Sequence, residues 1–288
     1  MGYLETRANL EGKVAAVIGG GGGLGRASAV DLGRAGVALA LCDRNEELLA
    51  ATAEEILAAG GRVITSLFDA REPEPLAAFF AALDQEYGRL DVLVNVVGGT
   101  FGQPFEESAP RGWEAIIRAN FVAMLHATHL AIPRMKASGG GSIISFTSIE
   151  GHRAAPRYAV YSGMKAAVTN FSRTLAIELA PDDIRVNTIA PDMIPTEGLA
   201  AVASRPDQDP AAAELGTRIA IPMGRKGGYE DVGGCVLFLA SDLSRFVTGT
   251  SLHPDGGAFA SAGWFNWPDD GFRNSVPSAV LDAMLGPD

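Results

Sequence analysis

Short runs of largely apolar residues alternate along this chain with longer segments in which apolar residues recur at helical spacing. The short runs are rich in Val and Ile and hold five or six residues each: Val14–Ile18, Ala38–Cys42, Val63–Phe68, Val92–Val97, Ser142–Phe146 and Val186–Ala190. Runs that stay apolar without alternating are typical of parallel strands buried on both faces. We therefore predict a parallel strand at each of them.

The longer segments are predicted to be helices, because their apolar residues fall on helical stripes. They are Arg26–Ala35, Glu46–Ala59, Pro75–Tyr87, Trp113–Met135 and Tyr158–Leu179, followed by a helix at Asp231–Leu239 and a last strand near Thr250–His253. The predicted fold is α/β, a single Rossmann-type doubly wound parallel sheet of about seven strands with helices on both faces. One domain would span residues 1–257, and residues 258–288 would form an extension outside this pattern.

The chain of 288 residues is acidic, with 34 Asp and Glu against 23 Lys and Arg and a formal net charge of −11. Lys and Arg are not clustered, so a nucleic-acid partner is not expected. The apolar runs are far shorter than the roughly 20 residues of a membrane-spanning helix, and no signal-peptide pattern precedes the first strand. The two cysteines have no metal or redox spacing. We expect a cytoplasmic protein that binds neither a membrane nor a metal.

The first predicted strand runs directly into a glycine-rich loop, Gly19–Gly25, which precedes a helix. Glycine lets the backbone turn tightly and approach a ligand closely, and the following helix offers unpaired N–H groups to a pyrophosphate. Two spacings fit within the loop: G-x-G-x-x-G beginning at Gly20 and G-x-x-x-G-x-G beginning at Gly19. The strand–loop–helix context predicts a dinucleotide site. A glycine-rich turn without a ligand is the alternative.

Asp43 ends the second predicted strand, 18 residues after Gly25. A carboxylate there accepts hydrogen bonds from both ribose hydroxyls and repels a 2′-phosphate, which favours NAD over NADP. The next residue, Arg44, carries a guanidinium that would instead bind a 2′-phosphate. The expected cofactor is NAD, and a solvated turn without a ligand is the alternative for this pair.

Tyr161 and Lys165 are four residues apart in a predicted helix, so they share one face. A phenol has an ordinary pKa near 10. A neighbouring ammonium and a positive nicotinamide ring would lower that pKa toward the working range of a base. Ser148 precedes Tyr161 by 13 residues, just after a predicted strand, and its hydroxyl is placed to hold a substrate oxygen. An exposed helix pair is the alternative for Tyr-x-x-x-Lys alone.

From about Leu10 to Gly257 the chain resembles the short-chain dehydrogenase/reductase family. The resemblance rests on residues in that family's order and spacing: the glycine loop, Asp43, Asp69, Asn95, Asn120, Ser148, Tyr161, Lys165, Pro191, Thr196 and Asp255-Gly256-Gly257. It implies that Tyr161 is the general acid and base. Lys165 would bond the nicotinamide ribose and lower the pKa of Tyr161. Ser148 would orient the carbonyl or hydroxyl, and Asn120 would hold a water that relays protons to Lys165.

The resemblance also implies a complete cofactor site. Asp69, followed by Ala70, would face the adenine amino group, and Asn95 would shape the floor of the cleft. The nicotinamide carboxamide would be received by Ile194 and Thr196. The full expected set is Gly19, Gly22, Gly23, Leu24, Asp43, Arg44, Asp69, Ala70, Asn95, Tyr161, Lys165, Ile194 and Thr196.

The sequence departs from the family's usual pattern at four places. Ile18 replaces the Thr before the first glycine, and the usual Asn-Asn-Ala-Gly is Asn95-Val96-Val97-Gly98. The usual Pro-Gly after the sixth strand is Pro191-Asp192, and Glu150 stands where a small residue is common. None of these positions is catalytic, so they bear on the cofactor loop and the substrate rather than on the reaction class.

The expected function is NAD-dependent interconversion of a secondary alcohol and a ketone, on a bulky apolar substrate of hydroxysteroid or terpenoid type. Reduction of 3-oxoacyl thioesters is the runner-up, and a non-catalytic dinucleotide-sensing protein is the alternative from another class. His152, Arg153 and Arg157 would form either a basic rim that attracts a carboxylate or CoA group or a solvated loop. The resemblance implies a homotetramer built through the helices Trp113–Met135 and Tyr158–Leu179.

Residues 258–288 hold five of the 21 aromatic residues (5 Tyr, 13 Phe and 3 Trp): Phe259, Trp264, Phe265, Trp267 and Phe272. Disordered tails are poor in such residues, because exposing them to water costs free energy. We expect Gly263–Phe272 to be ordered and to add apolar wall to a substrate site. That site would belong to its own subunit, beside Pro195–Ala203, or to a neighbouring one. Docking on the back of the domain is the alternative.

Overall fold

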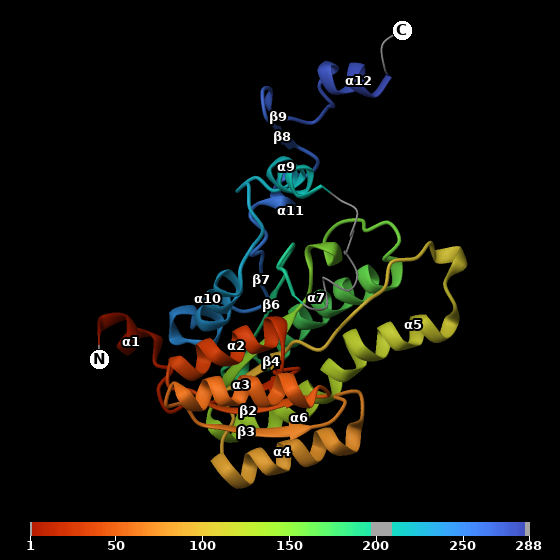
Figure 1. The fold of residues 1–288 in the computed structure, drawn as a ribbon. Coiled ribbons are helices and arrows are strands. Elements are labelled where there is room, and N and C mark those ends of the chain that lie inside the picture. Colours follow the sequence, from red (N-terminus) through yellow and green to blue (C-terminus); the bar gives the residue numbers. More distant parts are fainter. Residues whose placement is uncertain (1, 197–208, 286–288) are drawn as a thin grey trace.

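The computed structural model describes residues 2–196 and 209–285. Its centre is a parallel sheet of seven strands in the order β3-β2-β1-β4-β5-β6-β7 (Figure 1). The strands are β1 (Val14–Ile18), β2 (Ala38–Asp43), β3 (Val63–Leu67), β4 (Val92–Asn95), β5 (Gly141–Phe146), β6 (Ile184–Ile189) and β7 (Ser251–Leu252). The order reverses between β1 and β4, the switch point beyond which open α/β sheets bind ligands. The predicted doubly wound fold is confirmed.

Alternate residues of the central strands pack into two separate cores. In β1, Val14, Ala16 and Ile18 face one core, whereas Ala15 and Val17 face the other. Burial on both faces explains why the strand sequences do not alternate between apolar and polar residues. The first core is covered by α4 (Pro73–Tyr87), α6 (Ala123–Ser138) and α7 (Ala159–Leu179), and the second by α2 (Gly23–Arg34), α3 (Glu46–Ala58) and α10 (Tyr229–Ala240).

The single helix expected over Trp113–Met135 is interrupted. It consists of α5 (Pro110–Ile117), a π-helical turn η2 (Arg118–Val122) and α6. The wider turn places Asn120 so that its amide nitrogen donates to the carbonyl oxygen of Ile116, 2.9 Å away. Such turns are frequent at functional sites, and hydrophobic periodicity carries no signal for them.

By length and composition, the run Pro110–Ser138 would suffice to cross a membrane, with a mean hydropathy of 1.3 in its most apolar window. The search for short apolar runs overlooked it, because its apolar residues are interspersed with His and Arg. In the fold, Ala127, Ala131 and Met135 of α6 are buried in the first core. This face of the helix therefore covers the sheet.

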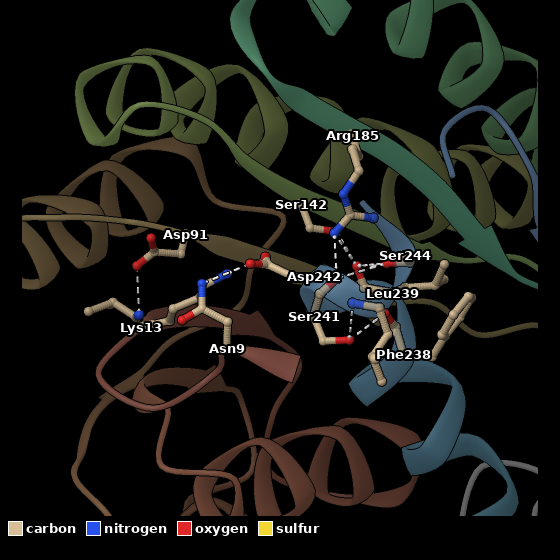
Figure 2. Close-up of polar contacts among 12 residues, drawn as sticks. Asn9, Lys13, Asp91, Ser142, Arg185, Phe238, Leu239, Ser241, Asp242 and Ser244 are labelled. Atoms are coloured by element: carbon tan, nitrogen blue, oxygen red, sulfur yellow. Dashed lines mark hydrogen bonds and ion pairs between the residues drawn. The ribbon is translucent and has the colours of Figure 1, made fainter. Parts of the chain in front are cut away.

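Hydrogen bonds close the amino edge of the sheet (Figure 2). Arg185 of β6 donates to the carbonyl oxygens of Leu239 at 2.7 Å and Ser241 at 3.3 Å, at the end of α10. Close by, Asp242 accepts hydrogen bonds from Asn9 at 2.8 Å and Lys13 at 3.1 Å, which ties the segment after α1 (Tyr3–Ala8) to the domain. These polar groups bind one another, so a ligand site is expected at the opposite, carboxyl edge.

The C-terminal extension has structure of its own. After α11 (Ala258–Ser261) come an antiparallel hairpin of β8 (Phe265–Trp267) and β9 (Gly271–Arg273) and then α12 (Ser278–Leu285). Strand β8 packs against α9 (Pro210–Ala220), the helix that follows residues 197–208. Helix α12 projects away from the sheet domain (Figure 1) and buries none of its side chains.

Candidate active site

A cleft of about 370 Å³ opens at the carboxyl ends of β1, β2 and β4. Six of the expected cofactor residues line it: Gly19, Gly22, Asp43, Arg44, Asp69 and Ala70. Its wall continues through residues 96–101 to Ile116 and Ala119 of the α5–η2 helix. Residues separated by up to about a hundred positions in the chain therefore meet in one cavity at the switch point of the sheet.

Close backbone approaches shape the glycine loop. The N–H groups of Gly19 and Gly20 both donate to the carbonyl oxygen of Cys42 at 2.9 Å, which fixes the loop to β2. Gly19 has a φ of +85°, in the left-handed region that glycine tolerates. A methyl group on Gly25 would lie 1.8 Å from the carbonyl oxygen of Gly19. Only glycine at position 25 therefore lets α2 begin so close to the loop.

The N-terminus of α2 faces this loop. Gly22 is its N-cap residue, Gly23 and Leu24 are its first helical residues, and no side chain caps it. The first N–H groups of a helix have no partner within the helix and favour negative charge. Because Gly22 and Gly23 present bare backbone, the loop has the chemistry of a pyrophosphate cradle.

Asp43 lies at the rim of the cleft, where β2 ends. Its carboxylate accepts the N–H groups of Gly21 and Asn45, each at 3.0 Å. A methyl group on Gly21 would lie 2.9 Å from the carboxyl carbon of Asp43, so the glycine allows the carboxylate to rest against the loop. Arg44 lines the same cleft. The carboxylate and the guanidinium expected to compete for the ribose region are both present.

Asp69, expected to face adenine, is engaged by a residue that the sequence analysis did not single out. Nε of Arg71 lies 2.9 Å from both carboxylate oxygens of Asp69, and the Arg71 N–H lies 3.0 Å from Oδ1. These hydrogen bonds, with a smaller effect from the charge of Arg44, hold the pKa of Asp69 below its usual range. The guanidinium-bearing residues Arg44 and Arg71 therefore both line the part of the cleft that contains Asp69.

Ser148 and Tyr161 are brought together by β5 and α7. Ser148 caps the short helix η3 (Ile149–Gly151), and its hydroxyl oxygen accepts the N–H of Glu150 at 3.2 Å. Burial raises the pKa of Tyr161, a hydrogen bond from Ser148 lowers it, and the charges of Glu150 and Asp192 raise it further. In the protein alone the phenol is therefore a weak acid, and it needs a nearby positive charge to act as a base.

Lys165 supplies a positive charge from the next turn of α7. Its Nζ lies 5.6 Å from the centre of the Tyr161 ring and donates to the carbonyl oxygen of Phe146 at 3.0 Å. Lys165 is only 4% exposed, and burial lowers its pKa to about 8. The predicted shared face of Tyr161 and Lys165 is present.

Asn120 lies behind this pair and is almost fully buried. Its amide nitrogen donates to the carbonyl oxygen of Gly99 at 2.8 Å, in addition to that of Ile116. A methyl group on Gly98 would lie 2.6 Å from Oδ1 of Asn120 and 3.2 Å from Nζ of Lys165. Gly98 is retained in the altered Asn-Val-Val-Gly motif. Its lack of a side chain therefore leaves room for the side chains of Asn120 and Lys165 to approach the backbone.

Seven of the thirteen expected cofactor residues are not among those that line the cleft, and three of them, Asn95, Ile194 and Thr196, lie neither in α2 nor in α7. Asn95 is buried at the end of β4, where its amide donates to Ser145 at 3.2 Å and Thr128 at 3.3 Å. It braces α6 against β5 instead of forming the floor of the cleft. Ile194 is 5% exposed and packs against Gly227. Thr196 is the last residue before 197–208, and most of the segment Pro195–Ala203 lies outside the described residues.

Aromatic side chains border Tyr161 on one side. A smaller cavity next to it is lined in part by Phe101, Phe105, Trp113 and Tyr158. The rings of Phe105 and Trp113 stack with their centres 5.1 Å apart. The sequence analysis missed this wall, because three of the four residues belong to the irregular β4–α5 segment or the first turns after it, where no periodic pattern marks them.

Of the two alternatives for the segment after Ser148, a basic rim and a solvated loop, the structure does not favour an uncompensated cation at Arg153. Its guanidinium lies 2.8 Å from the carboxylate of Glu150 and 3.8 Å from that of Asp192. Burial raises the pKa of Asp192 to about 6, although Arg153 opposes this. Glu150 and Asp192, two of the departures from the family pattern, therefore supply negative charges that face Arg153. The sequence around Arg153 alone does not indicate this pairing with Asp192.

His152 also contributes no positive charge to such a rim. Its ring lies 4.7 Å from that of His253 and 5.7 Å from that of Phe259, measured between centres. Burial lowers the pKa of His152, which favours the neutral imidazole. Within residues 2–196 and 209–285, no group of three or more His, Cys, Asp or Glu is arranged to hold a metal ion.

Comparison with known proteins agrees with this geometry. A family model described as enoyl-(acyl carrier protein) reductase matches residues 19–258. The 2,5-dichloro-2,5-cyclohexadiene-1,4-diol dehydrogenase of Sphingobium indicum is 35% identical over 248 residues, 86% of this chain and 96% of that protein. The chain belongs to the short-chain dehydrogenase/reductase family. It is therefore an oxidoreductase by family.

Other members of the family share its sequence or fold. The 3-oxoacyl-(acyl-carrier-protein) reductase of Thermotoga maritima is 32% identical over 86% of this chain and 98% of that protein. Carveol dehydrogenase from Mycobacterium avium, in complex with NAD, matches with a TM-score of 0.81 at 30% identity, over 87% of this chain and 98% of that one. A 7α-hydroxysteroid dehydrogenase complexed with NADH and 7-oxo glycochenodeoxycholic acid matches with a TM-score of 0.82 at 28% identity, over 89% of this chain and 98% of that one.

Proposed function

We propose that this protein is an NAD-dependent oxidoreductase that interconverts a secondary alcohol and a ketone. The observation that carries the proposal is the convergence of Ser148, Tyr161 and Lys165 beside the glycine-loop cleft. A protein that only sensed a dinucleotide would need the loop and Asp43, but it would have no use for a general base. The side chains at this site therefore favour proton transfer coupled to cofactor chemistry.

Each residue of the proposed site has a separate role in binding the substrate oxygen or in moving its proton. NAD, when bound, supplies the hydride acceptor or, in its reduced form, the donor. Ser148, whose oxygen accepts the N–H of Glu150, would donate its O–H to the substrate oxygen when substrate is bound, in place of the hydrogen bond that it makes to Tyr161 in the protein alone. Tyr161 takes the proton from an alcohol or returns it to a ketone oxygen. Lys165 stabilises the phenolate electrostatically, and Asn120 would hold the water through which protons reach Lys165.

The cradle fits a dinucleotide, because Gly22, Gly23 and Gly25 leave bare backbone at the N-terminus of α2. We propose NAD in preference to NADP, since Asp43, which would face the adenosine ribose, is held in place by two N–H donors. A 2′-phosphate would meet this fixed negative charge. Arg44 acts in the opposite direction, whereas Arg71 is committed to Asp69. The two structural relatives described above hold NAD or NADH.

A bulky apolar substrate of hydroxysteroid or terpenoid type is proposed. The aromatic wall of Phe101, Phe105 and Trp113 beside Tyr161 supports it, as do the alicyclic compounds named for the carveol and hydroxysteroid dehydrogenases. Reduction of 3-oxoacyl thioesters remains the second candidate on the strength of the Thermotoga relative. The pairing of Arg153 with Glu150 removes one of the two guanidinium groups that would have favoured an anionic carrier, whereas Arg157 lines the cavity beside Tyr161.

The deciding experiment follows the absorbance of NADH while the protein is incubated with NAD and a panel of steroid, terpenoid and alicyclic secondary alcohols. NADH with 3-oxoacyl thioesters forms the second arm. Turnover of alcohols that depends on Tyr161 supports the proposal. Turnover of thioesters alone would favour the second candidate, and tight NAD binding without turnover in either arm would favour a sensor.

We also propose that the protein is a cytoplasmic homotetramer built through α5–α6 and α7. Ile177 of α7 is 74% exposed although it is apolar, as expected for a side chain covered by a second copy. Sedimentation at micromolar concentration should give four times the chain mass of 30.0 kDa. A monomeric mass would contradict this proposal.

A further inference from the structure

Two departures from the family pattern, Glu150 and Asp192, form one cluster in space. Glu150 lies in η3 after β5, and Asp192 lies just beyond the end of β6. The N–H of Ile149 donates to the carbonyl oxygen of Pro191 at 3.3 Å, so the two segments run side by side. The guanidinium of Arg153 lies within ion-pair distance of both carboxylates, at 2.8 Å and 3.8 Å.

The balance of charge in this cluster is negative. Two carboxylates face one guanidinium, and the side chains of Glu150 and Asp192 are 25% and 17% exposed against 41% for Arg153. Asp255, which adds to the field at both Arg153 and Asp192, is itself held by the N–H groups of Gly257 at 2.9 Å and Phe259 at 2.8 Å. Arg153 is the most exposed member of the cluster, yet its positive charge is neutralised.

The cluster is close enough to the reacting groups to influence them, because the N–H of Glu150 donates to the hydroxyl oxygen of Ser148 at 3.2 Å. After burial and the hydrogen bond from Ser148, the remaining influences on the pKa of Tyr161 are the charges of Glu150 and Asp192, which both raise it. Coulomb interactions act on any charge within the same range. An anionic group on a substrate bound to Tyr161 would therefore be repelled if it faced this side of the site.

We propose that Glu150 and Asp192 determine which substrate charge the enzyme accepts. By neutralising Arg153 they exclude alcohols with a carboxylate or phosphate near the reacting carbon, and they admit neutral or cationic ones. The inference rests on the proposed alcohol–ketone activity and narrows its substrate class.

The test compares two substrates of nearly the same shape, 3-hydroxycyclohexane carboxamide and 3-hydroxycyclohexane carboxylate. Wild-type enzyme should oxidise the carboxamide with a kcat/KM at least about tenfold higher, the effect of placing like charges together. The double variant Glu150→Gln with Asp192→Asn leaves Arg153 unopposed, so the preference should disappear or reverse. As a control, Asp182→Asn breaks a 2.7 Å ion pair with Lys136 near the amino edge of the sheet, and it should leave the preference unchanged.

The pH profile distinguishes an electrostatic role from a structural one. The charges of Glu150 and Asp192 raise the pKa of Tyr161, and two cations lie near it, Lys165 on the same helix and Arg157 in the lining of the adjacent cavity. Glu150→Gln or Asp192→Asn should shift the rising limb of kcat/KM for the carboxamide to lower pH by about half a unit to one unit. Arg153→Gln should shift it to higher pH, because two carboxylates are then left uncompensated. Loss of packing alone has no reason to give shifts of opposite sign.

Equal kcat/KM values for the two substrates in the wild type would overturn the inference. So would a preference that the double variant leaves intact, or shifts of the same sign in all variants. If the wild type oxidises no neutral secondary alcohol of the panel, the proposed function fails and this inference fails with it. Turnover of neutral alcohols without charge preference removes the inference alone.

Discussion

Nζ of Lys165 lies 5.6 Å from the ring centre of Tyr161, and both side chains come from α7. The backbone of β5 holds the ammonium through the carbonyl oxygen of Phe146. Burial raises the pKa of Tyr161 and lowers that of Lys165, so in the protein alone burial favours the neutral phenol of Tyr161 and the neutral amine of Lys165. Their mutual attraction and the charge of a bound cofactor act against this. Such an arrangement is costly for folding and is typical of catalytic sites.

Replacing Tyr161 by Phe removes the proton carrier and little else. The phenyl ring keeps the packing of α7, so the fold and NAD affinity should be unchanged. Turnover of the best alcohol should fall by about 10²–10⁴, the typical contribution of positioned acid–base catalysis. Steady-state rates give kcat, and fluorescence titration with NADH gives the affinity. A variant that turns over at a near-normal rate would refute the mechanism.

Replacing Lys165 by Met should make the apoprotein more stable at pH 7 while abolishing activity. The pKa of Lys165 falls from 10.5 to about 8 on burial, so the folded state disfavours the charged side chain by about 3 kcal/mol at neutral pH. Losing the hydrogen bond to Phe146 offsets about 1 kcal/mol of this. Wild-type stability rises as pH increases from about 8 to about 10.5, because Lys165 loses its proton in the folded state first.

The advantage of Lys165→Met should therefore be largest below pH 8 and shrink toward pH 10.5. Thermal unfolding of the apoprotein at pH 7, 9 and 10 measures it. Lys136→Met is the matched control, since the Lys136 side chain is 46% exposed and is paired with Asp182. A Lys165 variant less stable than the wild type at pH 7, or a difference that ignores pH, would show that burial of the ammonium is not costly here.

The fold could be predicted because each buried strand has a local signature. Val14–Ile18 was predicted with the observed bounds, and Glu46–Ala59 is one residue longer than α3. The hairpin of β8 and β9 was not predicted, since strands of three residues leave too few positions for a periodic pattern. The π-helical turn around Asn120 was missed for a different reason, because it changes backbone winding without changing apolar spacing.

In the candidate site, too, some features have a local signature in the sequence and others have none. Asp43, Ser148, Tyr161 and Lys165 occupy positions fixed by strand ends and helical spacing, so a sequence pattern locates them. The pairing of Arg153 with Asp192 depends on two loops, 39 residues apart in the chain, meeting beyond β5 and β6. Such a meeting is set by the sheet order and leaves no local signal.

Replacing Asp43 by Ala should weaken the preference for NAD over NADP. The carboxylate accepts the N–H groups of Gly21 and Asn45, which fix its negative charge at the rim of the cleft, where we propose that the adenosine ribose binds. Without it, Arg44 would be able to meet the 2′-phosphate, and the ratio of the two dissociation constants should fall by at least about tenfold. The double variant Asp43→Ala with Arg44→Ala should lose the affinity for NADP that Asp43→Ala alone has gained. Tighter binding of NADP by the wild type would mean that Arg44 dominates.

The C-terminal extension begins next to the proposed substrate site. The ring of Phe259 stacks on His253 with centres 4.9 Å apart and also contacts His152, four residues after Ser148. The hairpin then packs on α9. Its aromatic side chains remain partly exposed, with Trp264 at 48% and Phe272 at 52%. Their exposed surfaces are therefore available to a substrate of the same subunit or to a neighbouring subunit.

Deleting residues from Gly263 onward should raise KM for the substrate and leave NAD affinity nearly unchanged. The deletion removes the aromatic hairpin and α12 but keeps Phe259 on His253, so the sheet domain and the glycine-loop cleft remain whole. Loss of about 1 kcal/mol of apolar contact corresponds to roughly a fivefold rise in KM.

A shorter deletion from Ser278, which removes only α12 and its exposed side chains, separates the contribution of the hairpin from that of α12. If the hairpin forms substrate wall within its own subunit, the shorter deletion should behave like the wild type. If α12 reaches a neighbouring subunit, both deletions should raise KM and weaken assembly in sedimentation. Unaltered KM and kcat after the longer deletion would show that the extension only packs on α9. The proposal of a bulky apolar substrate would then rest on the aromatic wall beside Tyr161 and on the compounds named for the carveol and hydroxysteroid dehydrogenases.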